Sequence, residues 1–453
     1  MVTYGCFTAP TSNRNLLTTF EVGQAGRGHP RQNERESRGG QVNIRLWKAS
    51  IGAVAAVAAL VATAAVPIGA ASAAGAPIKI ALITSESGIA AAEFSTSPQG
   101  FLARVDLQNA KGGINGRKID PIVFNDQGST TTVVTAVQQA IAEGAVGIVN
   151  DTPFFFAAYK VAQQDGVPVT GGSFDGPEWG EQPNTNMFAS DVGSIDPKYP
   201  IGTGLAQFLK SAGGTVLGSY GYGISSSSSR AASGAATAAK DVGMKVGVLD
   251  TSVPFGSVAF TTEALAAKSA GVNTLYGTMD NDSNFAILTA MQQAGVKLKV
   301  VVFPTGYEHD IVHGTVWKSV QGVYFNAEFR PFSLPNAGTK QMAAALQKYQ
   351  HRAPSNFPPY NIYESYVGAD LMIEGIQLAG KNPTHASVIK ALRNVKSYNA
   401  DGLLPESINF STIFGHNLPK SCGWYMKAEA NGFVATTKAP VCSGYLPNSN
   451  TAS

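Results

Sequence analysis

The chain has 453 residues, enough for two or three domains, and only 14% of them are charged. Its formal net charge is +3, but residues 1–74 contribute seven Lys and Arg against three Asp and Glu. The remaining chain therefore carries 26 basic and 27 acidic side chains and has no basic domain, which argues against nucleic-acid binding. Because 44% of the residues are hydrophobic, the chain can still bury a large core.

The N-terminal residues have the composition of an export signal behind a polar extension. Arg45 and Lys48 precede an apolar run, and small residues follow it at Ala71–Ala74. This order predicts a signal peptide over 45–74, with a transmembrane anchor as the alternative. Residues 1–44 lack periodicity, and we interpret them as a disordered extension or as a start codon placed too far upstream.

The next segment predicts a strand, a loop, a helix, a tight turn and a second strand. The strand 78–83 precedes a Ser-rich loop, and the helix that follows ends at Gly112-Gly113, where glycine readily adopts positive φ. Asn115-Gly116 is typical of a two-residue turn. The second strand, 118–125, ends just before Asp126.

The middle of the chain repeats one unit, an apolar helix that ends at glycine and is followed by a β-branched strand. The glycines are Gly166, Gly243, Gly271 and Gly295. The further strands expected are 145–150, 167–170, 215–220, 244–249, 272–277, 299–303 and 322–326. Alternating strands and helices predict parallel pairing, and nine strands fit two sheets better than one.

A long helix over 361–378 and a hairpin of strands 422–427 and 432–437 are expected near the C-terminus. Cys6 lies in the leader, so Cys422 and Cys442 are the cysteines of the exported part. We expect them to form a disulfide at the outer ends of the hairpin, with two buried free thiols as the alternative. No cysteine stands at the predicted cleavage site, so the sequence does not support a lipid anchor.

The first unit resembles the opening of the type I periplasmic binding proteins, in the branch that captures branched-chain amino acids and amides for ABC importers. The matching parts are the strand 78–83, the Ser/Gly loop 85–88, the GGING turn 112–116 and Asp126. The resemblance extends in order to about Ala379. It implies an α/β fold of two doubly wound parallel-sheet lobes joined by a hinge of several crossings.

The resemblance also sets the expected lobe boundaries. Crossings are expected near 191–200, 326–335 and 397–404. The predicted lobes are lobe I, residues 77–192 plus 328–396, and lobe II, residues 193–327 plus 397–453.

Ligands of doubly wound sheets bind beyond the carboxyl ends of the strands. On the first lobe, this rule and the family pattern select Ser85, the hydroxyl of Thr152, and the loop Gly172, Ser173 and Phe174. Backbone N–H groups of that loop would hold a carboxylate, unless the loop is an ordinary tight turn. The run that begins at Phe154 departs from the family, and its rings belong either to the core or to the pocket.

On the second lobe, the resemblance implies that Tyr222 covers the ligand and that Asp282 anchors an α-amino group. Asp280 is the alternative anchor, and both carboxylates could instead cap the helix 283–294. Tyr307 follows the next strand, where it would close the rim of the cleft.

Motifs for catalysis, metals or cofactors are incomplete. His309 and His313 are four residues apart but lack the glutamate of a zinc protease motif, and we interpret them as a surface pair. The sequence has no G-x-S-x-G elbow and no P-loop. We therefore expect no enzyme, no cofactor and no metal.

The sequence predicts an exported solute-binding protein that closes over a branched-chain or other amino acid, or an amide, and presents it to an ABC permease in the membrane. We expect a monomer in the periplasm or at the cell surface. The alternatives are a ligand-sensing receptor domain without transport and a secreted enzyme on a doubly wound fold.

Overall fold

The computed structural model describes residues 75–174, 176–179, 186–191, 201–413 and 420–446. The predicted signal peptide and the extension before it lie outside the described residues, as does most of the first predicted crossing.

The first sheet has the strand order β2-β1-β3-β4-β5, and all of its strands are parallel. Its strands are β1 (Ile78–Thr84), β2 (Ile119–Asn125), β3 (Gly147–Asp151), β4 (Val169–Gly171) and β5 (Met187–Ala189). Side chains of β1 alternate between two cores, with Ile80 and Leu82 in one and Ala81 and Ile83 in the other. Such a strand must be covered on both faces, which explains its nearly continuous hydrophobic run.

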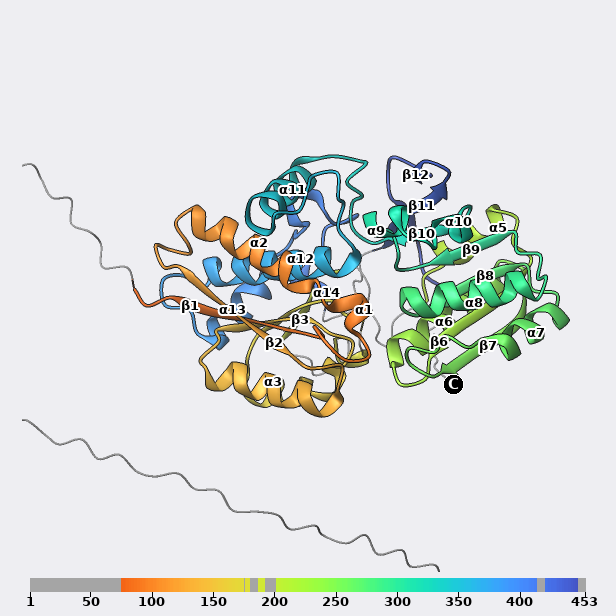
Figure 1. Cartoon of the computed structure of the whole chain (residues 1–453). Coiled ribbons are helices and arrows are strands. Elements are labelled where there is room, and N and C mark those ends of the chain that lie inside the picture. The colour runs from red at the N-terminus through yellow and green to blue at the C-terminus, as the bar shows by residue number, and fades with distance from the viewer. Residues whose placement is uncertain (1–74, 175, 180–185, 192–200, 414–419, 447–453) are drawn as a thin grey trace, which may run out of the picture. The chain divides into compact units, whose positions relative to one another are not determined.

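Helices from distant parts of the sequence cover the two faces of this sheet. One face is covered by α3 (Thr130–Ala142) and α4 (Tyr159–Gln164). The other is covered by α2 (Ser97–Ala110), which packs against α12 (Tyr360–Leu378) (Figure 1). The helices α11 (Ala337–Gln350) and α13 (His385–Leu392) complete this layer.

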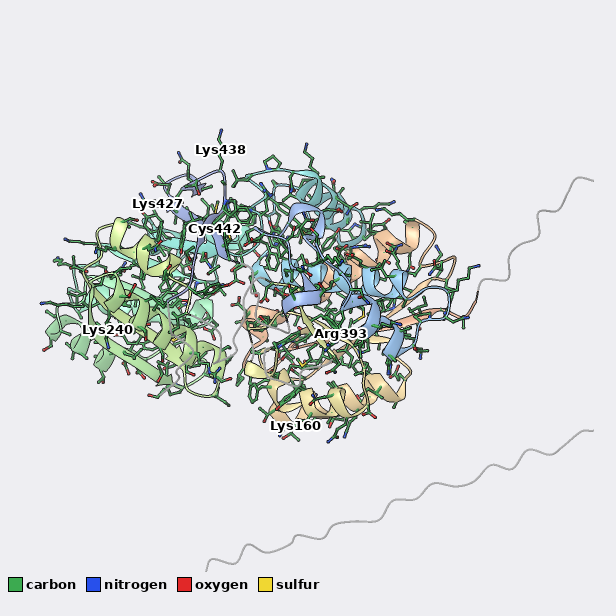
Figure 2. The ribbon with its side chains drawn as sticks, turned by 180° about the vertical axis from the view of Figure 1, so that it is seen from behind. Lys160, Lys240, Arg393, Lys427, Lys438 and Cys442 are labelled. Atoms are coloured by element: carbon green, nitrogen blue, oxygen red, sulfur yellow. A yellow bond between two sulfur atoms is a disulfide. The ribbon has the colours of Figure 1, made fainter. Side chains whose placement is uncertain are left out.

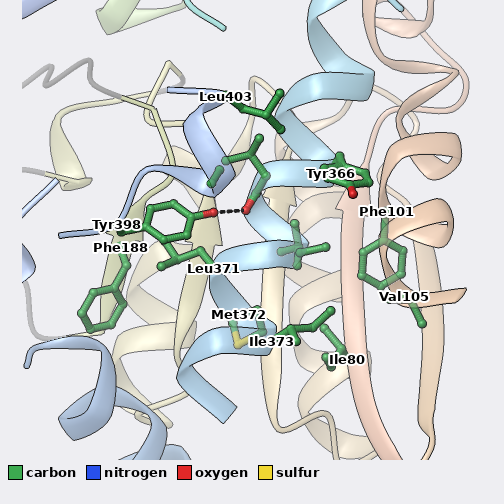
Figure 3. Packing of buried hydrophobic residues seen from close by; sticks show 14 of the residues in the cluster. Ile80, Phe101, Val105, Phe188, Tyr366, Leu371, Met372, Ile373, Tyr398 and Leu403 are labelled. Atoms are coloured by element: carbon green, nitrogen blue, oxygen red, sulfur yellow. Dashed lines mark hydrogen bonds between the residues drawn. The ribbon is translucent and has the colours of Figure 1, made fainter. Parts of the chain in front are cut away.

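The core between α2, α12 and the sheet contains large apolar side chains. Phe101 and Val105 of α2 face Ile80, Met372 and Ile373 (Figure 3). Tyr398 lies in the same cluster and donates a hydrogen bond from its hydroxyl to the Val367 carbonyl at 2.9 Å (Figure 3).

The second sheet has the order β12-β11-β10-β9-β8-β6-β7. The strands β6 (Val216–Tyr222), β7 (Lys245–Val253), β8 (Thr274–Thr278), β9 (Val300–Phe303) and β10 (Tyr324–Ala327) are parallel. The antiparallel strands β11 (Ser421–Glu429) and β12 (Gly432–Ala435) extend one edge, and β13 (Val441–Ser443) pairs with the beginning of β11.

Two helical layers cover the second sheet. One contains α5 (Gly204–Ser211) and α6 (Ser226–Asp241), and the other contains α7 (Thr261–Ser269) and α8 (Asn281–Gln293). The shorter elements are α1 (Ala91–Phe94), α9 (His309–His313), α10 (Trp317–Val320), α14 (Phe410–Ile413) and the 3₁₀ turns Phe155–Ala157, Pro177–Trp179 and Ala400–Gly402. The expected architecture of two parallel-sheet lobes is confirmed.

The predicted turns and helix ends are also confirmed. Asn115 and Gly116 both have positive φ, at 51° and 83°, and the residues on either side of them pair across the turn. The four glycines that were expected to end helices in the repeated unit all have positive φ between 62° and 78°. Glycine adopts this conformation without the penalty that a Cβ atom imposes, which explains its position at each helix end.

The third predicted boundary differs from the structure. Tyr398, Leu403 and Phe410 belong to the core beside the first sheet, so the chain passes to the second sheet only after Phe410. The sequence 397–404 lacks a clear strand pattern and was assigned by resemblance, which explains the error. We keep the two lobes as a proposal, with this boundary moved. The strands β5 and β13, each of three residues, were also not predicted.

The expected disulfide is present between Cys422 and Cys442, which are direct partners of the antiparallel pair β11–β13. Figure 2 shows Cys442 on the same lobe as Lys427 and Lys438. The bond ties the end of the described chain to a central part of the second lobe, because β11 also pairs with β10.

The crossing of α2 and α12 depends on Gly100. A Cβ atom at this position would overlap the Ile362 carbonyl oxygen and the Ser365 hydroxyl. The Ser365 hydroxyl donates a hydrogen bond to the Ser97 carbonyl at 2.6 Å, which holds the two helices at this short separation.

Gly100→Ala is expected to lower the free energy of unfolding by about 1–3 kcal/mol, because the two helices must move apart. Gly234→Ala is the matched control, since a Cβ atom at that helical position would meet only Ile201, at 3.5 Å or more. The control should be neutral or stabilising by up to about 1 kcal/mol. Urea unfolding of both variants measures the difference, and equal effects would contradict the packing argument.

Replacing Cys422 and Cys442 together by serine is expected to lower the free energy of unfolding by about 3 kcal/mol, because the bond closes a loop with a sequence separation of 20. Urea unfolding with and without reductant measures this. Thiol labelling of the denatured, unreduced chain should leave Cys422 and Cys442 unlabelled, and label on both of them would refute the bond.

Candidate functional site

The side chains at the carboxyl ends of the strands in both sheets form the candidate site. On the first lobe, the Ser85 hydroxyl donates to Asp126 Oδ1 at 2.6 Å, and the Thr152 hydroxyl donates to Asp126 Oδ2. Burial raises the pKa of Asp126, while hydrogen bonds from Ser85, Thr152 and the Gly128 N–H oppose that rise. Both hydroxyl protons are directed at this carboxylate, and the side chains of Ser85 and Thr152 are fully buried, so their role in binding a ligand stays a prediction.

The loop after β4 is bound within the protein. The Gly172 N–H donates to the Asn150 carbonyl at 3.3 Å. The Ser173 N–H and hydroxyl both donate to Asp191, at 3.2 and 2.7 Å. The sequence predicted that backbone N–H groups of this loop hold a carboxylate, but those of Gly172 and Ser173 already have partners in this conformation.

Phe174 contributes an aromatic ring to the candidate site. Its ring stacks on Phe94 at a centroid distance of 5.4 Å and lies 5.9 Å from Tyr360, at the start of α12. Its carbonyl accepts a hydrogen bond from the Ser227 hydroxyl at the start of α6, which joins the two lobes.

A second aromatic group also joins the lobes. Phe154 is buried, and its ring lies 5.7 Å from Phe255, which follows β7 of the second sheet. Phe255 in turn lies 4.5 Å from Tyr222. The ring of Phe154 therefore faces the other lobe at the carboxyl ends of the strands. From the sequence, this ring could belong either to the core or to the ligand pocket.

The second-lobe residues separate into buried and exposed positions. The Tyr222 hydroxyl donates to Ser283 Oγ at 2.7 Å and accepts from the Asp280 N–H at 3.3 Å. Asp280 is half-buried and caps α8, because its carboxylate accepts from the Ser283 N–H at 2.8 Å. Asp282 lies one residue inside α8, and its side chain is exposed. Of the two carboxylates that could cap this helix, Asp280 is the one that does so. The predicted role of Asp282, to anchor an α-amino group, stays a prediction.

Tyr307 lies in a small pocket between loops of the second lobe and α12. The pocket is lined by Tyr307, Glu328, Phe329, Tyr360 and Tyr363 among others. The ring of Tyr307 stacks on Phe357 at 4.9 Å, and burial raises its pKa to about 12. The pair His309 and His313 is on the short helix α9, with ring centroids 4.3 Å apart.

The sequence interpretation missed the acidic residues around this region. Asp151 ends β3, and Glu364 lies on α12, where both side chains are fully buried. Asp151 belongs to a loop that the strand-end rule selected, so the sequence contained a signal for it. Glu364 stands between Ile362, Tyr363 and Tyr366 in the first half of α12, and a carboxylate among these apolar positions was the signal for it.

A second acidic group joins side chains of both lobes. Burial raises the pKa of Glu93 on α1 well above its usual value, with further contributions from Glu308 and Asp280 on the second lobe. Burial also raises the pKa of Glu308 to about 7, and Asp310 adds to the effect. The Glu308 carboxylate accepts a hydrogen bond from Asn281 at 2.8 Å.

A family model described as periplasmic binding protein matches residues 77–432 of this chain. The chain belongs to the periplasmic binding protein family. It is a binding protein rather than an enzyme.

Individual relatives agree with this family. A Leu/Ile/Val-binding protein homologue of Brucella melitensis is 26% identical over 336 residues, which cover 73% of this chain and 86% of the relative. The branched-chain amino acid protein LivJ of Streptococcus pneumoniae, solved with isoleucine, is 18% identical with a TM-score of 0.64, over 81% of this chain and 99% of its own. A fatty acid ABC transporter substrate-binding protein of Thermomonospora curvata is 17% identical with a TM-score of 0.67, and the match covers 80% of this chain and 92% of that protein.

The described residues contain neither a candidate membrane span nor a candidate metal site. None of the helices described here is both long and apolar enough to cross a membrane. Nor do any three His, Cys, Asp or Glu side chains in that part of the chain come together as a possible metal site.

The raised pKa of Glu308 predicts a dependence of stability on pH. The folded state holds this proton up to about pH 7, whereas the unfolded state releases it near 4.5, so folding is favoured at low pH. The stabilisation is complete below pH 4.5 and is lost as the pH rises through 7. Glu308→Gln should remove a pH dependence of about 1–3 kcal/mol in the free energy of unfolding.

Urea unfolding between pH 4.5 and 7.5 measures this contribution. Glu143→Gln, at an exposed position after α3, is the control and should keep the pH dependence of the wild type. A Glu308→Gln profile parallel to that of the wild type would show that Glu308 does not titrate in this range.

Proposed function

We propose that the mature chain is exported and captures an amino acid or amide between its two lobes, which close around it by a hinge. The observation that supports this most is the meeting of side chains from both sheets at the carboxyl ends of their strands, where Phe154 faces Phe255 and Ser227 reaches Phe174. A closed protein would then deliver the solute to an ABC permease.

The names of two relatives support an amino acid as the ligand. The Brucella relative is described as a Leu/Ile/Val-binding homologue, and the Streptococcus protein was solved with isoleucine. The fatty acid protein has the same fold at a similar identity, so the fold alone does not decide the ligand. The choice of an amine-bearing solute therefore depends on the acidic residues of this chain.

We propose Asp280 as the carboxylate that receives the amine, in place of the exposed Asp282. Asp280 is half-buried, contacts Tyr222, and lies near Glu93 of the other lobe. An ammonium group held between these carboxylates would reduce their mutual repulsion when the lobes close.

Asp280→Asn is expected to weaken amino acid binding about 10-fold or more, because it removes the charge but retains a cap for α8. Asp282→Asn is the matched control at a neighbouring, exposed position, and its affinity should stay within a factor of about two. Calorimetric titration of the purified mature chain with leucine, isoleucine, valine and their amides measures both. Loss of affinity in Asp282→Asn alone would restore the anchor first predicted from the sequence.

The proposed closure of the two lobes can be measured separately from ligand affinity. Small-angle X-ray scattering with and without a bound solute should show a smaller radius of gyration in the complex, as expected for hinge motion. If no amino acid or amide binds, the proposed ligand class is wrong, and if one binds without compaction, the hinge is wrong.

A further inference from the structure

Two buried carboxylates beside the candidate site have oxygens without hydrogen-bond partners. Neither oxygen of Asp151 has a hydrogen bond, and neither does Glu364 Oε2, although both side chains are fully buried. Glu364 Oε1 accepts a hydrogen bond from the Ser190 hydroxyl at 2.6 Å. The Ser97 side chain lies close enough to Asp151 to oppose the rise in pKa that burial causes, but it does not reach hydrogen-bonding geometry. Buried carboxylate oxygens normally have donors, so three orphaned oxygens in one region require an explanation.

These two carboxylates belong to one contiguous acidic group beneath Phe174. A Cβ atom added at Gly172 would touch both Phe174 and Glu364, which places Glu364 directly under this loop. Asp191 is held by Ser173 of the same loop. Burial raises the pKa of Glu364, and Asp191 and Asp151 add to the rise.

No basic side chain of the described residues forms an ion pair with Asp151 or Glu364. The ion pairs found there are Arg104–Asp370, His309–Asp310 and Lys427–Glu429. An isolated buried carboxylate costs several kcal/mol unless it is protonated or meets a cation. The acidic group can therefore bind a cation, and no described side chain supplies one.

The walls of this region suit an organic cation. Tyr360 lies within electrostatic range of Glu364, Glu328, Asp191 and Asp151, and its ring faces Phe174. Phe94 and Phe174 provide stacked rings next to it. Aromatic faces attract ammonium and guanidinium groups and also pack against the alkyl chain that carries them. A metal ion fits less well, since the described residues contain no group of three metal-ligating side chains.

We propose that Asp151 and Glu364 form a cation subsite, which receives an ammonium or guanidinium group at the far end of the captured solute. The inference rests on the proposed function, because it assumes that a solute enters between the lobes. It makes the ligand a basic amino acid or a diamine, with a second positive charge besides the amine at Asp280, rather than a neutral branched-chain amino acid.

Lysine and norleucine test the subsite, because they share a backbone and a linear side chain and differ in the terminal ammonium group. Calorimetric titration of the mature chain should show lysine, arginine or a diamine such as putrescine binding at least 10-fold more tightly than norleucine. Glu364→Gln and Asp151→Asn should each remove most of that preference by weakening the binding of lysine. Asp165→Asn, at an exposed position after α4, is the control and should retain the preference.

Thermal unfolding of the free variants separates binding from folding. Both amide variants should melt at or above the temperature of the wild type, because each removes a buried charge without changing its shape. Leucine or norleucine binding as tightly as lysine would overturn the subsite and leave the proposed function intact. Unchanged lysine affinity in both variants would also overturn it, since the carboxyls would then be neutral structural groups. Failure of every amino acid and amine to bind would overturn the subsite and the proposed ligand class together.

Discussion

The parallel pairing of β1 with both β2 and β3 is the constraint on which the first lobe depends. A strand with parallel neighbours on both sides is buried on both faces, and its chain must return over the sheet through helices. All the strand ends then lie along one edge, which brings Ser85, Asp151 and the loop at Gly172 together although they are far apart in sequence. The second sheet repeats this arrangement over β6 to β10, so two such edges supply the walls of the candidate site.

The buried carboxylates along these edges differ in the number of hydrogen bonds that they accept. This number separates carboxylates with a structural role from those that could bind a ligand. Asp126 is buried but accepts hydrogen bonds from two hydroxyls and one N–H, so it organises the loops around it. Asp151 is equally buried and has no such partners. A carboxylate of the first kind is complete in the free protein, whereas one of the second kind has binding capacity left over. Residue type alone does not distinguish the two.

The local structure was largely predictable from the sequence because its signals are local. Asn115-Gly116 and the glycines at helix ends require particular φ angles, and the β-branched runs identify the strands. The boundary after Phe410 was missed because it depends on where Tyr398 and Leu403 pack, which no local pattern records. The same limit applied to the site. The strand-end rule selected the correct loops, but it could not reveal that Ser173 donates to Asp191 or that Glu364 of a distant helix lies beneath Gly172.

The placement of α12 has a consequence for the order in which the chain becomes structured. This helix buries 14 of its 19 residues, and it covers a sheet whose strands all precede residue 190. During synthesis from the N-terminus, the first sheet therefore has one uncovered face until nearly the whole chain has been made. Its inner contacts span more than 250 positions, as in the hydrogen bond between Ser365 and Ser97, and such long-range closure is slow. The first lobe can therefore complete its core only after α12 has been made, so its folding follows the synthesis of most of the chain.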